Sequence, residues 1–276
     1  MRRDSRGILF DMDGVLYDGE APIAGAAEAI AWVRAQKIPF LFVTNTTSRS
    51  RAALVRKLEQ FGIATSAAEI LTPCVATAHW LREQSPGPIA LFVRPSAQEE
   101  FAGLPSVSPD AETGAQYVII GDLGETWNYR TLNRAFRLLH SEPDSKLIAL
   151  GMTRYWRTAE GLALDVAPFV VALEHATGRQ ALVFGKPAAA FFHTAAAELK
   201  LAPENVLMIG DDVRTDIGAA QSAGMSAALV QTGKFRPLDL QGEVKPDVVL
   251  ASVAELPPWW ERNSQCTKIL RKRSRR

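Results

Sequence analysis

Four short polar segments carry side chains that together could transfer a phosphoryl group. In chain order they are Asp11-Met12-Asp13-Gly14, Thr44-Asn45, Gly185-Lys186-Pro187 and Gly210-Asp211-Asp212 with Asp216. A phosphate ester is anionic and repels nucleophiles, so a site that acts on it must supply positive charge. Carboxylates that hold Mg²⁺ and a lysine ammonium are two ways to supply that charge. This set of residues is therefore typical of magnesium-dependent phosphoryl transfer.

Each polar segment lies at the end of an apolar run that predicts a buried strand. With two later runs, the predicted strands are Gly7–Phe10, Pro39–Thr44, Ala181–Phe184, Asn205–Ile209, Ser226–Val230 and Asp247–Leu250. Helical patterns alternate with these runs, which favours parallel strands joined by crossover helices. Open parallel sheets bind ligands in the crevice at the carboxyl ends of their strands. We therefore expect the four polar segments to meet at one edge of a sheet.

The helical patterns are bounded by recognisable start and stop signals. Apolar residues at helical spacing, with Gly62 as a C-cap, predict a helix over Arg51–Phe61, and Gly224 closes a second helix over Asp216–Ala223. The other predicted helices are Ala24–Gln36, Pro73–Gln84, Tyr129–His140, Val166–Thr177 and Ala188–Leu199.

The middle of the chain, about residues 75–180, has an α/β pattern of its own. It contains predicted strands at Ile89–Val93, Tyr117–Ile120 and Lys146–Leu150. A Pro-Gly break at residues 85–88 and Gly178 mark plausible hinges. We therefore predict a doubly wound parallel-sheet, Rossmann-like core from residues 1–74 and 181–276, with an inserted α/β cap domain at 75–180.

Charge is unevenly distributed along the chain. Seven of the 31 Lys and Arg residues lie in the tail at 262–276, which has no acidic residue, so residues 1–261 hold 24 basic and 30 acidic residues, about −6. A basic end is usually a solvated, frayed terminus, and a weak contact with nucleic acid or an anionic surface is the alternative. We expect no nucleic-acid partner.

The cysteines and the N-terminus bear on the compartment. Cys74 and Cys266 are the two cysteines, and neither has metal-ligand spacing with another Cys or with a His. A disulfide framework is therefore excluded. No signal peptide or membrane span is readable, because Asp11 interrupts the short apolar stretch after the basic N-terminus. We expect a cytoplasmic protein without a membrane partner.

Taken in order, the four polar segments resemble the motifs of the haloacid dehalogenase superfamily of phosphatases. The matching branch has a large α/β cap between its second and third motifs. The resemblance covers nearly everything from Gly7 to about Leu256, and the tail lies outside it. It implies Mg²⁺ as cofactor, a small phosphorylated substrate and an aspartyl-phosphate intermediate. We also leave open a homodimer formed through the cap.

The resemblance implies a role for each acid of the first segment. Asp11 is implied as the nucleophile, and Asp13 as the general acid and base that serves the leaving group and the attacking water. The implied metal ligands are Asp11, Asp211 and the main-chain carbonyl of Asp13. Gly14 permits the tight backbone that follows.

The remaining polar residues are implied to surround the phosphoryl group. Thr44, the amide of Asn45 and Lys186 are implied to bind its non-reacting oxygens. Asp216 is implied to support the metal shell or to orient Lys186, with Asp212 as a further supporting residue.

Four stretches resemble a subgroup of these phosphatases that acts on pyrophosphate and on N-phosphorylated lysine or histidine. They are Phe42–Thr47, Leu132–Leu139, Gly161–Asp165 and Thr232–Pro237. Phosphohistidine phosphatases of the animal type often carry serine where this chain has Asp13. Because the acid is kept here, we expect turnover of ordinary phosphate esters as well.

The predicted cap holds the candidates for substrate selection. These are Arg154, Tyr155, Trp156 and Arg157, together with Asp165. In this branch the corresponding loop faces the catalytic cavity. The alternative is a solvated loop between a strand and a helix.

We therefore predict a phosphatase that hydrolyses small phosphate monoesters, pyrophosphate or N-phosphorylated amino acids. A phosphotransferase that uses the same aspartyl-phosphate is one alternative. A non-catalytic interaction protein that binds anionic partners through the basic tail is another. The sequence lacks G-x-G-x-x-G after the first strand, G-x-x-x-x-G-K-[ST] and G-x-S-x-G, which disfavours dinucleotide, P-loop and α/β-hydrolase sites.

Overall fold

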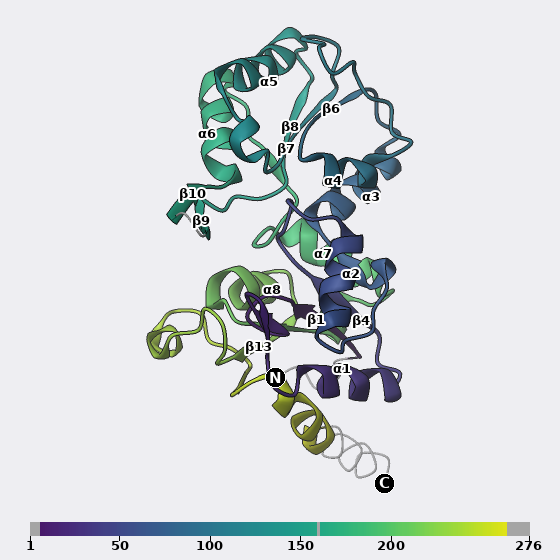
Figure 1. The fold of residues 1–276 in the computed structure, drawn as a ribbon, viewed down its shortest axis with the longest axis vertical. Coiled ribbons are helices and arrows are strands. Elements are labelled where there is room, and N and C mark those ends of the chain that lie inside the picture. Colours follow the sequence, from purple (N-terminus) through teal and green to yellow (C-terminus); the bar gives the residue numbers. More distant parts are fainter. Residues whose placement is uncertain (1–5, 159–160, 264–276) are drawn as a thin grey trace. The chain divides into compact units, whose positions relative to one another are not determined.

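The computed structural model of the chain describes residues 6–158 and 161–263 (Figure 1). The chain divides into two compact units. The first unit comprises Met1–Thr44, Ala52–Leu71 and Phe192–Arg276, and the second comprises Asn45–Arg51 and Thr72–Phe191. Most of the basic tail, residues 264–276, lies outside the described residues.

A six-stranded parallel sheet forms the centre of the first unit. Its strands run in the order β14-β13-β12-β1-β4-β5. Their bounds are β1 Gly7–Asp11, β4 Phe40–Val43, β5 Ile70–Leu71, β12 Val206–Gly210, β13 Ser226–Val230 and β14 Val248–Leu250. All residues of β1, β12 and β13 are buried, as expected for strands covered on both faces. The strand order reverses beside β1, which is the switch point of a doubly wound sheet.

Helices and a small hairpin surround this sheet. The helices are α1 Ala26–Ala35, α2 Arg51–Gln60, α7 Ala189–Glu198, α8 Ala219–Ser222 and a π-helix, η5, at Val213–Gly218. The hairpin consists of β2 Tyr17–Asp18 and β3 Ala21–Pro22, which pair antiparallel. The 3₁₀ turns are η1 Ala67–Glu69, η4 Pro203–Asn205, η6 Pro237–Gln241 and η7 Val253–Glu255, and a last helix includes residues 256–263. Buried aliphatic side chains and the rings of Phe10 and Phe42 form one core.

The second unit has a parallel sheet of its own, in the order β11-β8-β7-β6. The strands are β6 Ile89–Phe92, β7 Tyr117–Ile120, β8 Lys146–Ala149 and β11 Leu182–Val183, and a separate hairpin pairs β9 Tyr155–Thr158 with β10 Gly161–Leu164. The helices are α3 Pro73–Gln84, α4 Pro95–Gln98, α5 Tyr129–Ser141 and α6 Val166–Thr177, with 3₁₀ turns η2 Glu99–Phe101 and η3 Gly124–Thr126.

The α/β architecture predicted from the sequence is confirmed, with one correction to the sheet. The strand predicted at Ala181–Phe184 forms as β11, but it pairs with Ile148 and Ala149 of β8 instead of with the six-stranded sheet. An apolar run predicts a strand without saying which sheet it joins. The limits of the two units also differ from the predicted core and cap boundaries at 74 and 180, and the division into a core and a cap domain stays a prediction.

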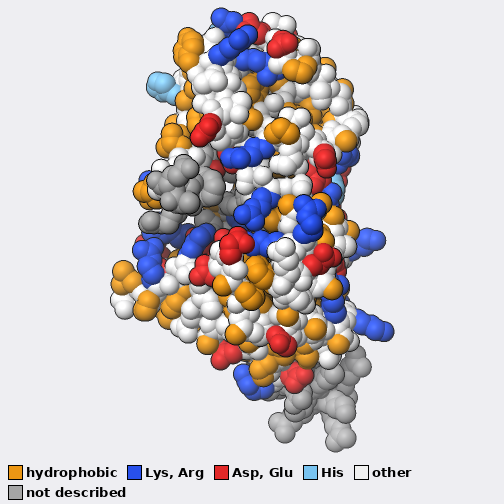
Figure 2. Space-filling model, in the orientation of Figure 1, with side chains coloured by type: hydrophobic (Ala, Val, Ile, Leu, Met, Phe, Trp, Pro, Cys, Tyr) orange, Lys and Arg blue, Asp and Glu red, His pale blue; other side chains and the backbone are white. Residues whose placement is uncertain are grey.

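None of the helices within residues 6–158 and 161–263 is both long and apolar enough to cross a membrane. Basic and acidic side chains are interspersed on the face drawn in Figure 2, with hydrophobic side chains scattered between them.

Candidate active site

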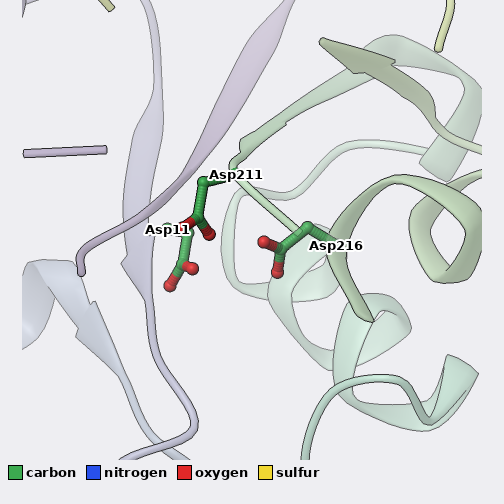
Figure 3. Close-up of side chains that lie close together, drawn as sticks. All are labelled: Asp11, Asp211 and Asp216. Atoms are coloured by element: carbon green, nitrogen blue, oxygen red, sulfur yellow. The ribbon is translucent and has the colours of Figure 1, made fainter. Parts of the chain in front are cut away.

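Three carboxylates meet at the carboxyl ends of two neighbouring strands (Figure 3). Asp11 ends β1, Asp211 follows β12, and Asp216 lies in η5. The strands are parallel neighbours in register, with Phe10 opposite Ile209, so their ends reach the same edge of the sheet. One carboxylate oxygen from each of the three side chains lies within 4.8 Å of the other two.

All three carboxylates are buried. Asp11 is 7% exposed, Asp211 1% and Asp216 0%. Carboxylates this close repel one another, and burial removes the water that would screen the repulsion. Carboxylate oxygens are also the ligands that hard divalent cations prefer. The donor set therefore fits a divalent metal ion such as Mg²⁺.

Main-chain N–H groups hold each carboxylate in place. Met12 donates to Oδ1 of Asp11 at 2.8 Å. Lys234 donates to Oδ2 of Asp211 at 2.7 Å, and Asp212 donates to Oδ2 of Asp216 at 3.2 Å. The backbone thus fixes one oxygen of each of the three carboxyl groups.

Two glycines enclose the carboxyl group of Asp211. Gly14 has φ +85° and Gly233 has φ +60°, and a Cβ at either position would collide with Oδ2 of Asp211. The hydroxyl of Thr232 donates to the Gly14 carbonyl at 2.5 Å, which ties the two glycine loops together. Both loops need glycine for conformation and for space.

Gly14→Ala should therefore displace Asp211 and weaken divalent-cation binding. The left-handed backbone alone costs roughly 1–2 kcal/mol of stability. Gly103→Ala is the matched control, because Gly103 has φ +81° with nothing within 4 Å of its Cβ position. Urea unfolding with and without Mg²⁺ is the measurement. Gly14→Ala should lose more stability than the control and also lose the stabilisation by Mg²⁺. Equal losses in the two variants would contradict the enclosure.

Lys234 supplies a positive charge to this site, and no role was predicted for it from the sequence. Burial alone would lower the pKa of its ammonium, but the nearby carboxylates, led by Asp211, raise that pKa above its ordinary value. The other contributing charges are those of Asp11, Asp212 and Asp216. Lys234 follows the end of β13, so the rule that polar residues after parallel strands line the site could have identified it.

The side chain of Asp13 is not one of the three clustered carboxylates. Its side chain is exposed, and its Oδ1 accepts the main-chain N–H of Gly19 at 3.2 Å. Asp13 also forms an isolated bridge with Tyr17, at the base of the β2–β3 hairpin. The acid is thus held by the hairpin.

Asp212 and Asp216 occupy different places. Asp212 caps η5, where its Oδ1 accepts the N–H groups of Arg214 at 2.9 Å and Thr215 at 3.0 Å. Burial alone would raise the pKa of Asp212, but these N–H groups lower it, so the stabilisation from this cap is present at neutral pH and is lost as the pH falls. Asp216 contributes a carboxylate to the cluster, and its supporting role stays a prediction.

The remaining phosphate-binding candidates fall in both units. Thr44 of the first unit is buried, and its N–H donates to Leu71 at 3.2 Å. In the second unit, the Asn45 side chain binds the main chain of Lys186 on both sides. Oδ1 of Asn45 accepts the Lys186 N–H at 2.7 Å, and Nδ2 donates to the Lys186 carbonyl at 2.8 Å. Asn45 therefore fixes the backbone of the buried lysine.

The candidates for substrate selection all belong to the second unit. Arg154 and Tyr155 are exposed, and the Arg154 guanidinium lies 5.9 Å from the Tyr155 ring centre. Asp165 caps α6 through the Val166 N–H at 2.8 Å, and burial raises the pKa of its carboxyl. Trp156 and Arg157 lie in β9, and their side chains are outside what the structure describes. The selective role of all five stays a prediction.

Family models and curated proteins match this chain over much of its length. Residues 8–104 match the model described as haloacid dehalogenase-like hydrolase, and residues 183–256 match a second model of the same kind. The human phospholysine phosphohistidine inorganic pyrophosphate phosphatase is 39% identical over 255 residues, covering 91% of this chain and 92% of the relative. The mouse haloacid dehalogenase-like hydrolase domain-containing protein 2 is also 39% identical, over 86% of this chain and 88% of the relative.

Solved structures of phosphatases share the fold. A p-nitrophenyl phosphatase from Archaeoglobus fulgidus is 27% identical with a TM-score of 0.83, covering 92% of this chain and 98% of that chain. A 4-nitrophenylphosphatase from Thermotoga maritima is 28% identical with a TM-score of 0.82, covering 92% and 97%. The resemblance stated from the motifs is thereby confirmed. The chain belongs to the haloacid dehalogenase-like hydrolases and is a phosphatase of that family.

Proposed function

We propose that this phosphatase hydrolyses small phosphorylated compounds with the help of Mg²⁺, through a phosphoryl group carried on Asp11. The observation that supports the proposal most is the cluster of three buried carboxylates, Asp11, Asp211 and Asp216. A bound Mg²⁺ would offset the charge of the cluster and attract the phosphoryl oxygens.

In the first half of the proposed reaction, a carboxylate oxygen of Asp11 attacks phosphorus. A bond forms between that oxygen and phosphorus, and the bond to the leaving oxygen breaks. Asp13 gives its proton to the leaving oxygen as the bond breaks. The product of this half is an aspartyl-phosphate, which divides one difficult displacement into two easier ones.

In the second half, water attacks the same phosphorus. Asp13, now ionised, takes a proton from that water, and the bond between phosphorus and Asp11 breaks. Phosphate leaves, and both acids return to their starting states. Thr44, the Asn45 amide and Lys186 are proposed to hold the non-reacting oxygens, and Lys234 supplies a further positive charge beside the cluster.

The substrate class follows from the relatives. Their names specify phospholysine, phosphohistidine and inorganic pyrophosphate for the curated phosphatases, and p-nitrophenyl phosphate for the structures. We propose small phosphate monoesters, pyrophosphate or N-phosphorylated amino acids for this chain. We also propose that residues 75–180 form a cap domain, with Arg154-Tyr155-Trp156-Arg157 and Asp165 selecting the leaving group.

Metal removal tests the proposal. Wild-type protein should release phosphate from p-nitrophenyl phosphate with Mg²⁺ present, lose that activity in excess EDTA and regain it when Mg²⁺ is restored, because the clustered carboxylates repel an anion without the metal ion. The release of p-nitrophenol is followed by absorbance. Turnover that is unchanged by EDTA would contradict the Mg²⁺ dependence. Comparing pyrophosphate, phospholysine and phosphohistidine in the same assay would then rank the proposed substrates.

A further inference from the structure

Lys57 is a lysine on the inner face of a helix. It lies in α2, where its buried neighbours are Leu54 and Leu58, and it is itself 8% exposed. Burying an ammonium group is costly unless its donors find partners. The contacts of Lys57 therefore indicate why a charge is kept at this position.

The nearest of those contacts lie on the β2–β3 hairpin, and the ring of Phe61, 6.0 Å from Nζ, lies farther away. Nζ of Lys57 donates to the main-chain carbonyl of Gly19 at 2.7 Å and lies 4.3 Å from the centre of the Tyr17 ring. It also lies 3.0 Å from Oε1 of Glu20, whose side chain is 81% exposed. An ion pair with so exposed a partner contributes little. The carbonyl and the ring are the contacts that fix the lysine.

Gly19 joins Lys57 to Asp13. The carbonyl of Gly19 accepts from Lys57, while its N–H donates to Oδ1 of Asp13 at 3.2 Å. Nothing lies within 4 Å of the Cβ position of Gly19, so no side chain packs against this residue at that point. Lys57 therefore holds Gly19, and the N–H of Gly19 holds the carboxyl of Asp13, the proposed acid.

We propose that Lys57 is a positioning residue for Asp13, acting through Gly19 of the hairpin. This role rests on the proposed function, in which Asp13 protonates the leaving oxygen. Lys57 keeps the turn at a fixed place, and the Gly19 N–H of the turn keeps the Asp13 carboxyl in one orientation. Without Lys57 the turn moves more freely, and proton transfer to the leaving oxygen becomes less efficient.

The leaving group provides a specific test. Phenyl phosphate and p-nitrophenyl phosphate have nearly the same shape, but phenolate is the stronger base and depends more on a proton from the acid. In Lys57→Met, kcat/KM should fall about tenfold for phenyl phosphate and less than about threefold for p-nitrophenyl phosphate. The tenfold loss is smaller than the full contribution of a general acid, because Asp13 itself is still present. A loss of fold stability alone would lower both values by the same factor.

Three variants control the comparison. Arg56→Met removes the same charge from an exposed position on the same helix and should leave both values unchanged. Lys57→Arg keeps a donor for the Gly19 carbonyl. The ratio of kcat/KM for the two esters should therefore stay close to that of wild type. In an Asp13→Asn background, Lys57→Met should not lower kcat/KM for phenyl phosphate further relative to p-nitrophenyl phosphate. The reason is that Lys57 acts only through Asp13.

Amide hydrogen exchange gives a readout that is independent of activity. The Gly19 N–H should exchange faster in Lys57→Met than in wild type, while amides of β1 keep their protection. If Lys57→Met does not fold, Lys57→Gln is the second variant, with the same expectation. Wild type that releases phosphate from neither ester, nor from pyrophosphate, phospholysine or phosphohistidine, would refute the proposed function, and the positioning role with it. Wild type that hydrolyses both esters, with a variant that loses both equally, would overturn the positioning role alone.

Discussion

Asp11→Asn should lower the turnover of p-nitrophenyl phosphate by at least about 10³-fold, because an amide oxygen cannot replace the carboxylate as nucleophile. Asp11 lies at the end of the central strand β1, 7% exposed, with its Oδ1 held by the Met12 N–H. The substitution keeps size and shape and removes one negative charge. The fold should therefore persist while the chemistry stops.

Rapid-quench labelling tests the nucleophile more directly than turnover does, because it detects a phosphoryl group bound to the protein. Wild type mixed with labelled substrate should hold a transient phosphoryl group that survives acid and is released by hydroxylamine, whereas Asp11→Asn should hold none. Asp18→Asn is the control, since Asp18 is an exposed acid in the nearby hairpin. A variant at Asp11 with undiminished turnover would refute the assignment of the nucleophile.

Asp211→Asn should have opposite effects on stability and on activity. The metal-free variant should unfold at a higher temperature than wild type, because the substitution removes one of three buried charges whose oxygens lie within 4.8 Å. The asparagine oxygen can still accept the Lys234 N–H, so the local hydrogen bond remains. Phosphate release should fall on the order of 10²–10³-fold, the usual cost of losing one group that stabilises transition-state charge.

Thermal unfolding at increasing Mg²⁺ concentration measures how much the stabilisation by Mg²⁺ depends on Asp211. A ligand that binds only the folded state stabilises it by about 2.7 kcal/mol at 100 times its Kd. Wild type should follow this dependence, and Asp211→Asn should show little of it over the same concentrations. Asp18→Asn should behave as wild type. A metal-dependent rise in melting temperature that is equal in wild type and Asp211→Asn would show that Asp211 does not bind the ion.

The sequence predicts much of this fold because its signals are local. The helices α3 and α6 begin and end as predicted, since a cap precedes each: Thr72 accepts the Val75 N–H, and Asp165 accepts the Val166 N–H. Gly178 then closes α6 in the left-handed conformation. Apolar runs followed by polar residues likewise place Asp11 and Asp211 at strand ends.

Other parts of the site depend on contacts that no local pattern encodes. The π-helix at 213–218 replaces the start of the predicted α-helix and carries Asp216 into the carboxylate cluster. The hairpin that holds Asp13 has strands of two residues, too short for an alternating pattern. Lys57 gives no signal either, because lysines commonly border the apolar face of a helix with their stems buried.

The central claim is that Asp11 and Asp211 bind one divalent cation. A crystal structure of the protein grown with Mn²⁺ tests it most directly, because the anomalous signal locates the ion without reference to the protein. We predict one ion about 2 Å from a carboxylate oxygen of Asp11 and of Asp211, at the carboxyl ends of β1 and β12. An ion bound elsewhere, or carboxyl groups too far apart to contact the same ion, would contradict the account.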